Sequence, residues 1–257
     1  MLTVSPIPAF NDNYIWLITR AGSSDAFVVD PGDGQVVADT LTERGLTLTG
    51  ILVTHHHFDH VGGLAQLREA YAPVVYGPDN PGIQGIDVTV AAGDRVKVLG
   101  QTFSVLAVPG HTLDHIAYVS DGDAPLLFCG DTLFAGGCGR VFEGTPEMMH
   151  HSLSTLAALP GDTRIFCAHE YTLANLAFAS AVEPDNADLA QRVKTATDMR
   201  AAGEPTVPST LALELATNPF LRCQEPELLA SLRRQGRLDA DHGAGVFAAV
   251  RGWKDNF

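Results

Sequence analysis

The sequence predicts a layered α/β domain followed by a helical C-terminal domain, and three observations support this. Short apolar runs rich in β-branched residues alternate with helical patterns through the first two-thirds of the chain. Several of these runs end in histidine or aspartate, at the position where α/β sheets carry their functional groups. After Tyr171 the strand patterns disappear, and helical segments separated by Pro and Gly follow.

Composition narrows the class of protein. The chain has 257 residues, of which 46% are hydrophobic, enough for one large domain or a main domain with a small one. The formal net charge of −14 argues against a binder of nucleic acid or of anionic membranes. We find no apolar run of roughly 18 residues and no N-terminal secretory signal. The four scattered cysteines suit reduced thiols, so we expect a cytoplasmic protein; a monomer is our expectation for its assembly.

The first part of the chain is predicted to be rich in strands, with helices between them. Strands are expected at 1–8, 14–20, 26–30, 48–53, 74–76, 116–120, 126–130 and 164–169, a hairpin at 94–108, and helices at 36–44 and 64–71. Asp30 ends the third strand, an unusual place for a carboxylate. It either forms a turn or caps the helix that follows, or else it orients a ligand histidine.

The stretch Thr54–His60 reads Thr-His-His-His-Phe-Asp-His and follows a buried strand. Imidazole nitrogens and carboxylate oxygens are suited to zinc, iron or manganese. One metal cannot easily take four ligands from six consecutive residues, so the motif predicts two adjacent metals. The candidate ligands in this stretch are His55, His57, Asp59 and His60. The plainer alternative is a solvated histidine-rich loop.

Three later strand ends repeat this arrangement. His111 follows Pro-Gly, Asp131 follows Gly130, and His169 ends the run Ile165–Ala168. Asp131 is a candidate bridging ligand, since one carboxylate can hold two cations, although a turn aspartate is the ordinary alternative. The other histidines have no comparable placement: His56, His115, His150, His151 and His242. Cys138 is expected to be a bystander thiol, because metals would already supply a nucleophile.

The C-terminal helices are predicted at 173–181, 188–202, 211–216, 225–234 and 243–253. They suggest a division into a catalytic domain at residues 1–171 and a helical substrate-binding domain at residues 172–257.

The ordered motifs resemble those of the metallo-β-lactamase superfamily. The fuller set, with Gly-Asp-Thr-Leu-Phe, Gly137-Cys-Gly-Arg140, His-Glu-Tyr-Thr, Asn218-Pro-Phe and the terminal Arg-x-x-Lys-Asp, is similar to the glyoxalase II (hydroxyacylglutathione hydrolase) family over essentially the whole chain. The resemblance implies an αββα sandwich with a small C-terminal helical domain and two divalent metal ions, zinc first, with iron or manganese as alternatives. The ligands implied are His55, His57 and His111 for one metal, Asp59, His60 and His169 for the other, and Asp131 as the bridge.

The resemblance also implies a set of residues that bind glutathione: Arg140, Phe142, Tyr171, Arg251 and Lys254. Many family members carry Lys and Tyr where this chain has Arg140 and Phe142. Arginine keeps the charge and adds a planar fork for a carboxylate. Phe142 keeps the ring and loses a hydroxyl donor.

The activity implied is hydrolysis of S-(2-hydroxyacyl)glutathione thioesters, with S-D-lactoylglutathione giving D-lactate and glutathione in methylglyoxal detoxification. The nucleophile expected is a hydroxide that two metals would hold, and Asp59 would orient it and accept its proton. Three alternatives remain open here: another hydrolase of this fold, a glutathione persulfide dioxygenase with one iron, and a non-catalytic metal-binding protein.

Overall fold

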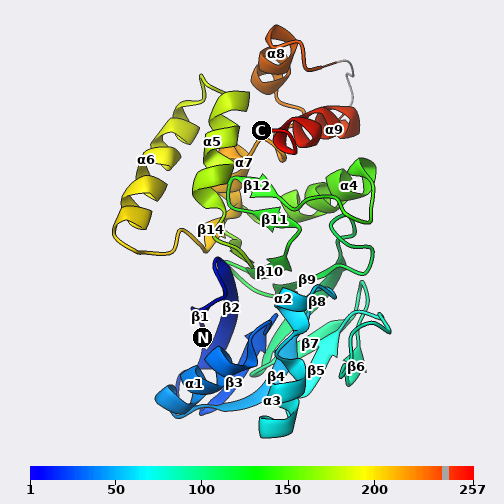
Figure 1. Ribbon diagram of the computed structural model, residues 1–257, viewed down its shortest axis with the longest axis vertical. Helices are drawn as coiled ribbons and strands as arrows, with labels where there is room; N and C mark the ends of the chain where they lie inside the picture. The colour runs from blue at the N-terminus through cyan, green and yellow to red at the C-terminus, as the bar shows by residue number, and fades with distance from the viewer. Residues whose placement is uncertain (239–242) are drawn as a thin grey trace. The chain divides into compact units, whose positions relative to one another are not determined.

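The computed structural model describes residues 1–238 and 243–257, so His242 lies outside the described residues. The chain divides into two compact units, whose elements are labelled in Figure 1. Unit 1 consists of Met1–Ala107 and Asp114–Gly130, and unit 2 consists of Val108–Leu113 and Asp131–Phe257.

A six-stranded sheet forms the first part of unit 1. Its strands lie in chain order: β1 (Leu2–Ala9), β2 (Asn13–Arg20), β3 (Asp25–Val29), β4 (Thr47–Leu52), β5 (Val74–Gly77) and β6 (Val88–Thr89). The first three strands pair antiparallel, and β3 to β6 pair parallel. Parallel pairing brings the carboxyl ends of β3 and β4 to one edge of the sheet, where Asp30 and Thr54 follow.

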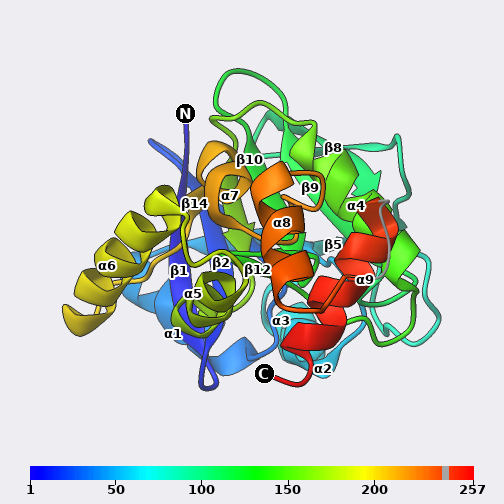
Figure 2. The ribbon, with the colours of Figure 1, turned by 90° about the horizontal axis from the view of Figure 1, so that it is seen from above.

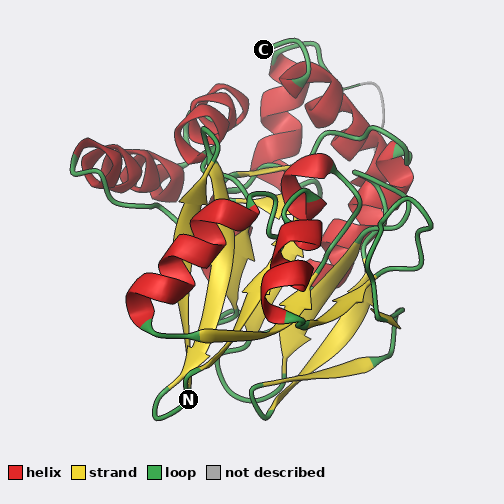
Figure 3. Ribbon diagram, turned by 60° about the horizontal axis from the view of Figure 1, so that its bottom comes forward, coloured by secondary structure: helices red, strands yellow, loops and turns green. Residues whose placement is uncertain are grey.

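Two helices contact this sheet: α1 (Gly34–Arg44) against β1, and α3 (Leu64–Tyr71) against β4. Figure 3 shows helices lying against the face of a sheet. The Asp33 side chain accepts the backbone N–H groups of Gln35 and Val36 and so begins α1. A shared core joins the apolar side chains of the helices and the strands, among them Leu17, Val28, Val37, Leu41, Ile51, Leu64, Leu67 and Val75.

A second set of strands in unit 1 forms an antiparallel meander. It consists of β7 (Arg95–Val98), β8 (Gln101–Ala107), β9 (Ile116–Ser120) and β10 (Leu126–Gly130). Tyr118 on β9 is fully buried, and its hydroxyl donates to the carbonyl of Val53 at 2.9 Å. This bond ties the meander to the residue that follows β4, so unit 1 holds two layers of strands.

Unit 2 contains two short strand pairs and most of the helices. The pairs are β11 (Leu133–Phe134) with β12 (Gly137–Cys138) and β13 (Arg164–Cys167) with β14 (Ser209–Thr210). The longer helices are α4 (Pro146–Ala157), α5 (Thr172–Val182), α6 (Ala187–Ala201), α7 (Leu211–Thr217), α8 (Pro226–Arg234) and α9 (Gly243–Lys254). Helices α5 and α6 are neighbours, as are α4 and α9 (Figure 2).

Aromatic side chains from distant segments form part of the unit 2 core. The ring centroids of Phe178 and Phe220 lie 6.0 Å apart, and those of Phe220 and Phe247 lie 5.7 Å apart. These contacts join α5, the Asn218-Pro-Phe segment and α9. Among the described residues, no helix has the length and apolar character needed to cross a bilayer.

The predicted layered α/β fold with a helical C-terminal region is confirmed. The sequence did not predict α2 (Phe58–Val61), β6, the β11–β12 pair or β14. These strands have two residues each, and α2 has four, about one helical turn, so the apolar periodicity that marks an element cannot develop within them. The division at residue 171 stays a prediction.

Candidate active site

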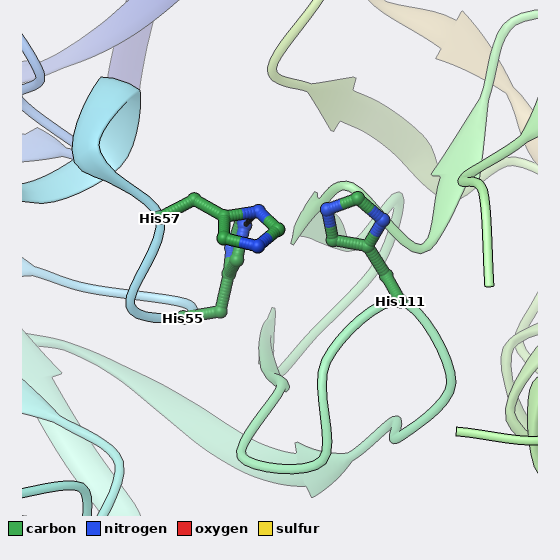
Figure 4. A group of neighbouring side chains, drawn as sticks. All are labelled: His55, His57 and His111. Atoms are coloured by element: carbon green, nitrogen blue, oxygen red, sulfur yellow. Dashed lines mark hydrogen bonds between the residues drawn. The ribbon is translucent and has the colours of Figure 1, made fainter. Parts of the chain in front are cut away.

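The Thr54–His60 loop leaves β4 and carries two imidazoles whose ring nitrogens converge. Nε2 of His55 lies 3.1 Å from Nδ1 of His57, and the two rings are drawn together in Figure 4. Nδ1 of His55 lies 3.1 Å from the hydroxyl oxygen of Thr54. His55 is fully buried, and its Nδ1 contact fixes the ring so that Nε2 turns toward His57.

Asp30 orients the next histidine of the loop. Its carboxylate accepts the backbone N–H of Thr54 at 2.8 Å and the Thr54 hydroxyl at 2.7 Å, and it lies 3.0 Å from Nδ1 of His60. Asp30 is 4% exposed and has a φ of +53°, a left-handed conformation that aspartate tolerates better than most residues. Asp30 thus contacts the His60 ring at Nδ1, as expected of a residue that orients this imidazole.

Asp59 is fixed by contacts with Asn13 and His60. Its Oδ2 accepts the side-chain amide of Asn13 at 2.9 Å and lies 3.5 Å from Nε2 of His60. The loop passes very close to Gly32: a Cβ there would lie 1.9 Å from the carbonyl oxygen of Asp59. His115 is buried and stacks on His55 with a centroid distance of 4.5 Å. The four ligands predicted from this motif are therefore gathered in unit 1.

Unit 2 contains the other three predicted ligands, two histidines and an aspartate, and both imidazoles lie near one oxygen of the aspartate. Oδ2 of Asp131 lies 3.3 Å from Nε2 of His111 and 3.4 Å from Nε2 of His169. Nδ1 of His111 lies 2.8 Å from the carbonyl oxygen of Arg140, which orients the ring. Figure 4 also draws His111, at the tip of its own loop. At Gly139 a Cβ would lie 1.9 Å from the Asp131 carbonyl oxygen, so this close approach requires glycine.

The donor groups fit a metal in spacing as well as in type. Two ligands at tetrahedral positions around zinc, with bonds of about 2.0–2.1 Å, lie about 3.3 Å apart. The donor distances within each unit run from 3.1 Å to 3.5 Å. By number and type, these histidines and aspartates are compatible with a dinuclear metal site.

The two aromatic residues predicted to bind glutathione lie beside metal-ligand candidates. Tyr171 stacks on His169 with a centroid distance of 4.7 Å and an interplanar angle of 3°. The Phe142 ring meets that of His111 edge-on at 5.2 Å. Tyr171 is 38% exposed and Phe142 is 60% exposed, so both rings present a surface to solvent.

The three predicted basic residues differ in exposure. The Arg140 side chain is 60% exposed. Arg251 is buried, and its Nη1 donates to the carbonyl of Cys138 at 3.2 Å. Lys254 is half-buried, and its Nζ donates to the carbonyl of Ala174 at 3.2 Å. Burial, and then the charge of Arg251, lower the pKa of Lys254 below its ordinary value.

Sequence reasoning missed three residues that support the site. Asn13 donates its side-chain amide to Asp59 at 2.9 Å. Phe134 packs edge-on against both His169 and Tyr171, at 5.8 Å and 5.4 Å. Asp255 contacts two of the predicted basic residues, although the motif that contains it had been recognised. Asn13 alone had a local signal, as a polar residue directly before the predicted strand 14–20. The contacts of Phe134 and Asp255 depend on tertiary structure.

Comparison with known proteins identifies the family. Residues 10–169 match the model for the metallo-beta-lactamase superfamily, and residues 170–257 match the model for the hydroxyacylglutathione hydrolase C-terminus. The hydroxyacylglutathione hydrolase of Chromohalobacter salexigens is 55% identical over 257 residues, covering 100% of each chain.

Two solved structures are similar over most of the chain. ETHE1 from Myxococcus xanthus has a TM-score of 0.66 and 27% identity, covering 99% of this chain and 98% of its own. TTHA1623, in a di-iron-bound form, has a TM-score of 0.61 and 27% identity, covering 85% of this chain and 100% of its own. The chain therefore belongs to the hydroxyacylglutathione hydrolase (glyoxalase II) family, with the metallo-β-lactamase fold and that family's helical C-terminal region.

Proposed function

We propose that this chain hydrolyses S-(2-hydroxyacyl)glutathione thioesters, converting S-D-lactoylglutathione to D-lactate and glutathione. The observation that best supports the proposal is the set of side chains around Asp131. One of its oxygens lies within 3.4 Å of two imidazoles, and each imidazole has a solvent-exposed aromatic ring of the predicted glutathione set beside it. Proposed metal ligands and proposed substrate-binding rings are therefore neighbours within unit 2. The full-length similarity to hydroxyacylglutathione hydrolases supports the same substrate class.

The predicted ligands would hold two divalent cations. The assignment proposed is His55, His57 and His111 for one, Asp59, His60 and His169 for the other, and Asp131 for both. When bound, such a pair supplies a water of lowered pKa and a positive charge for the oxyanion of an attacked carbonyl. Zinc is the proposed metal, with iron or manganese as alternatives, because imidazole and carboxylate suit all three.

The chain's own residues would position and deprotonate the attacking water. Asp59 is about one-third exposed, and its Oδ2 is fixed by the Asn13 amide, so this carboxylate can accept a proton at a defined place. Tyr171 and Phe142 would receive the glutathione part of the substrate. Arg140 and Lys254 would supply positive charge for its carboxylates. A thiolate is a good leaving group, so the reaction requires no strong general acid.

The setting of this activity is also proposed. A hydrolase of this kind would act in methylglyoxal detoxification in the cytoplasm, as a monomer that binds neither nucleic acid nor membranes. The net charge of −14 supports the last part, because it disfavours contact with polyanions.

Substitution of His169 by alanine tests the assignment. His169→Ala removes an imidazole that lies 3.4 Å from Asp131. We expect the variant to lose most of one metal per chain. Hydrolysis of S-D-lactoylglutathione should fall by more than the roughly 10–100-fold typical of losing a group that only orients a ligand. Metal content by atomic emission and thioester absorbance are the measurements.

His151→Ala is the matched control, because His151 is an exposed histidine of α4. It should retain both metals and full turnover. Unchanged turnover in His169→Ala would rule out the proposed ligand assignment.

A further inference from the structure

A single carboxylate contacts two of the basic residues that the family resemblance predicts to bind glutathione. Asp255 follows the last residue of α9, and its backbone N–H donates to the carbonyl of Arg251 at 3.0 Å. Its Oδ1 accepts from Nε and Nη2 of Arg251 at 3.1 Å and 2.9 Å. The same oxygen lies 3.7 Å from Nε of Arg140. One oxygen therefore links the C-terminal helix to the segment that follows β12.

Arg251 is held on several sides by neighbours in unit 2. Asp255 engages its Nε–Nη2 edge, and the Cys138 carbonyl accepts from Nη1 at 3.2 Å. The guanidinium carbon lies 5.1 Å from the ring centroid of Phe220. Arg251 is only 7% exposed, so its charge requires a nearby counter-charge, and Asp255 supplies one.

Arg140 and Lys254 keep more contact with solvent. The Arg140 side chain is 60% exposed, and its guanidinium carbon lies 5.8 Å from the ring centroid of Phe142. Nζ of Lys254 lies 5.0 Å from the ring centroid of Phe178. Repulsion between neighbouring cations would spread these groups apart, and the lowered pKa of Lys254 reflects its burial and the charge of Arg251. The Asp255 carboxylate contacts Arg251 and Arg140 and so offsets the repulsion between these two cations.

We infer that Asp255 is a positioning residue for substrate recognition: it fixes Arg251 and draws Arg140 toward α9, so that Arg140 and Lys254 present their charges to a carboxylate of the glutathione group. This inference rests on the proposed function. Asp255 itself does not contact the reacting thioester. Its effect is expected on binding of the glutathione part and not on the chemical step.

The substitution Asp255→Asn distinguishes two possible roles of Asp255, because they predict opposite changes in affinity. Asp255→Asn keeps the size of the side chain and removes its negative charge. If Asp255 positions the cations, the Kd for free glutathione should rise about tenfold through loss of charge-assisted bonds. The KM for S-D-lactoylglutathione should rise similarly while kcat stays within about twofold. If Asp255 only competes with the substrate for positive charge, removing it should lower both Kd and KM.

A second ligand, glutathione esterified at its glycine carboxylate, tests which carboxylate of glutathione the cations bind. Calorimetry compares its Kd with that of free glutathione. The Asp255→Asn penalty should shrink to less than about twofold for the ester if this carboxylate is the one that the cations bind. An equal penalty on both ligands, or a Kd that does not change, would overturn the inference. Calorimetry of glutathione binding requires no turnover. A wild-type enzyme that binds glutathione but does not hydrolyse the thioester would contradict the proposed function without contradicting this inference.

Asp198→Asn is the matched control, since Asp198 is an exposed aspartate of α6. It should leave Kd, KM and the urea midpoint unchanged. Asp255→Glu restores the charge, and it should recover at least part of the lost affinity. A loss of folding in Asp255→Asn would appear as a lowered urea midpoint. The test of the inference would then be Asp255→Glu, which restores the negative charge. If Asp255→Glu folds normally and still loses all affinity for glutathione, the inference is overturned.

Discussion

Cys138 lies in β12, buried, with its sulfur 3.7 Å from Nη1 of Arg251. Burial raises the pKa of this thiol to about 11, and the nearby Arg251 charge offsets only part of that effect. The thiol is therefore protonated at neutral pH, which argues against a nucleophilic role. The buried thiols of Cys167 and Cys223 also have raised pKa values, of about 12.

We predict that Cys138→Ala retains kcat within about twofold, and that the native protein reacts very slowly with a thiol reagent at pH 7.5. Because the folded-state pKa of Cys138 lies above its ordinary value, burial of the neutral thiol stabilises the fold below about pH 9. That contribution should be lost as the pH rises through about 11. Rapid modification of wild type at pH 7.5, with loss of activity that Cys138→Ala escapes, would contradict this account.

At the scale of single residues, the sequence predicts ligands better than the contacts that orient them. His55 and His57 could be named because their spacing and the preceding strand are local features. The choice between the two roles of Asp30 required its distance to Nδ1 of His60, 30 residues away. Arg251 was expected to face the substrate, and its burial became visible only in the folded chain.

At the scale of elements, the β11–β12 hairpin depends on α7 and the residue after it. Glu214 accepts the backbone N–H of Gly136 at 2.8 Å, and Asn218 donates to the carbonyl of Gly137 at 2.9 Å. Arg192 of α6 forms an ion pair with Glu214, and both side chains are buried. The hairpin carries Phe134, which packs against His169. This buried network thus supports the hairpin whose Phe134 packs against the proposed metal ligand His169.

We predict that Glu214→Ala lowers the free energy of unfolding by about 3–5 kcal/mol, because it leaves the Arg192 charge buried without its partner. Urea denaturation monitored by circular dichroism measures the change. Glu204→Ala removes an exposed carboxylate and should cost less than about 0.5 kcal/mol. Equal effects of the two substitutions would show that the buried pair contributes little to stability.

Elements with a long repeating pattern were predictable, and those made by tertiary pairing were not. The helix expected at 188–202 is observed as Ala187–Ala201. Strand β14 has two residues and exists because Ser209 and Thr210 pair with β13. No local pattern signals such a pairing.

At the scale of the whole molecule, the family could be inferred because its motifs extend along the full chain. The predicted boundary after residue 171 lies two residues from the junction of the two matched family models, at residues 169 and 170. The two compact units divide the chain elsewhere, since residues 131–257 all belong to unit 2. Contacts of α5 with β12 and of Asn218 with the hairpin account for this difference, because they join the helical region to strands that precede it.

The central claim is that this chain is a dinuclear hydroxyacylglutathione hydrolase. The most direct test measures metal content per chain together with hydrolysis of S-D-lactoylglutathione on the same purified sample. The account predicts two divalent metals per chain and rapid loss of the thioester absorbance. A sample with two metals and no turnover would contradict the proposed substrate, and a fully active sample with one metal would contradict the dinuclear site.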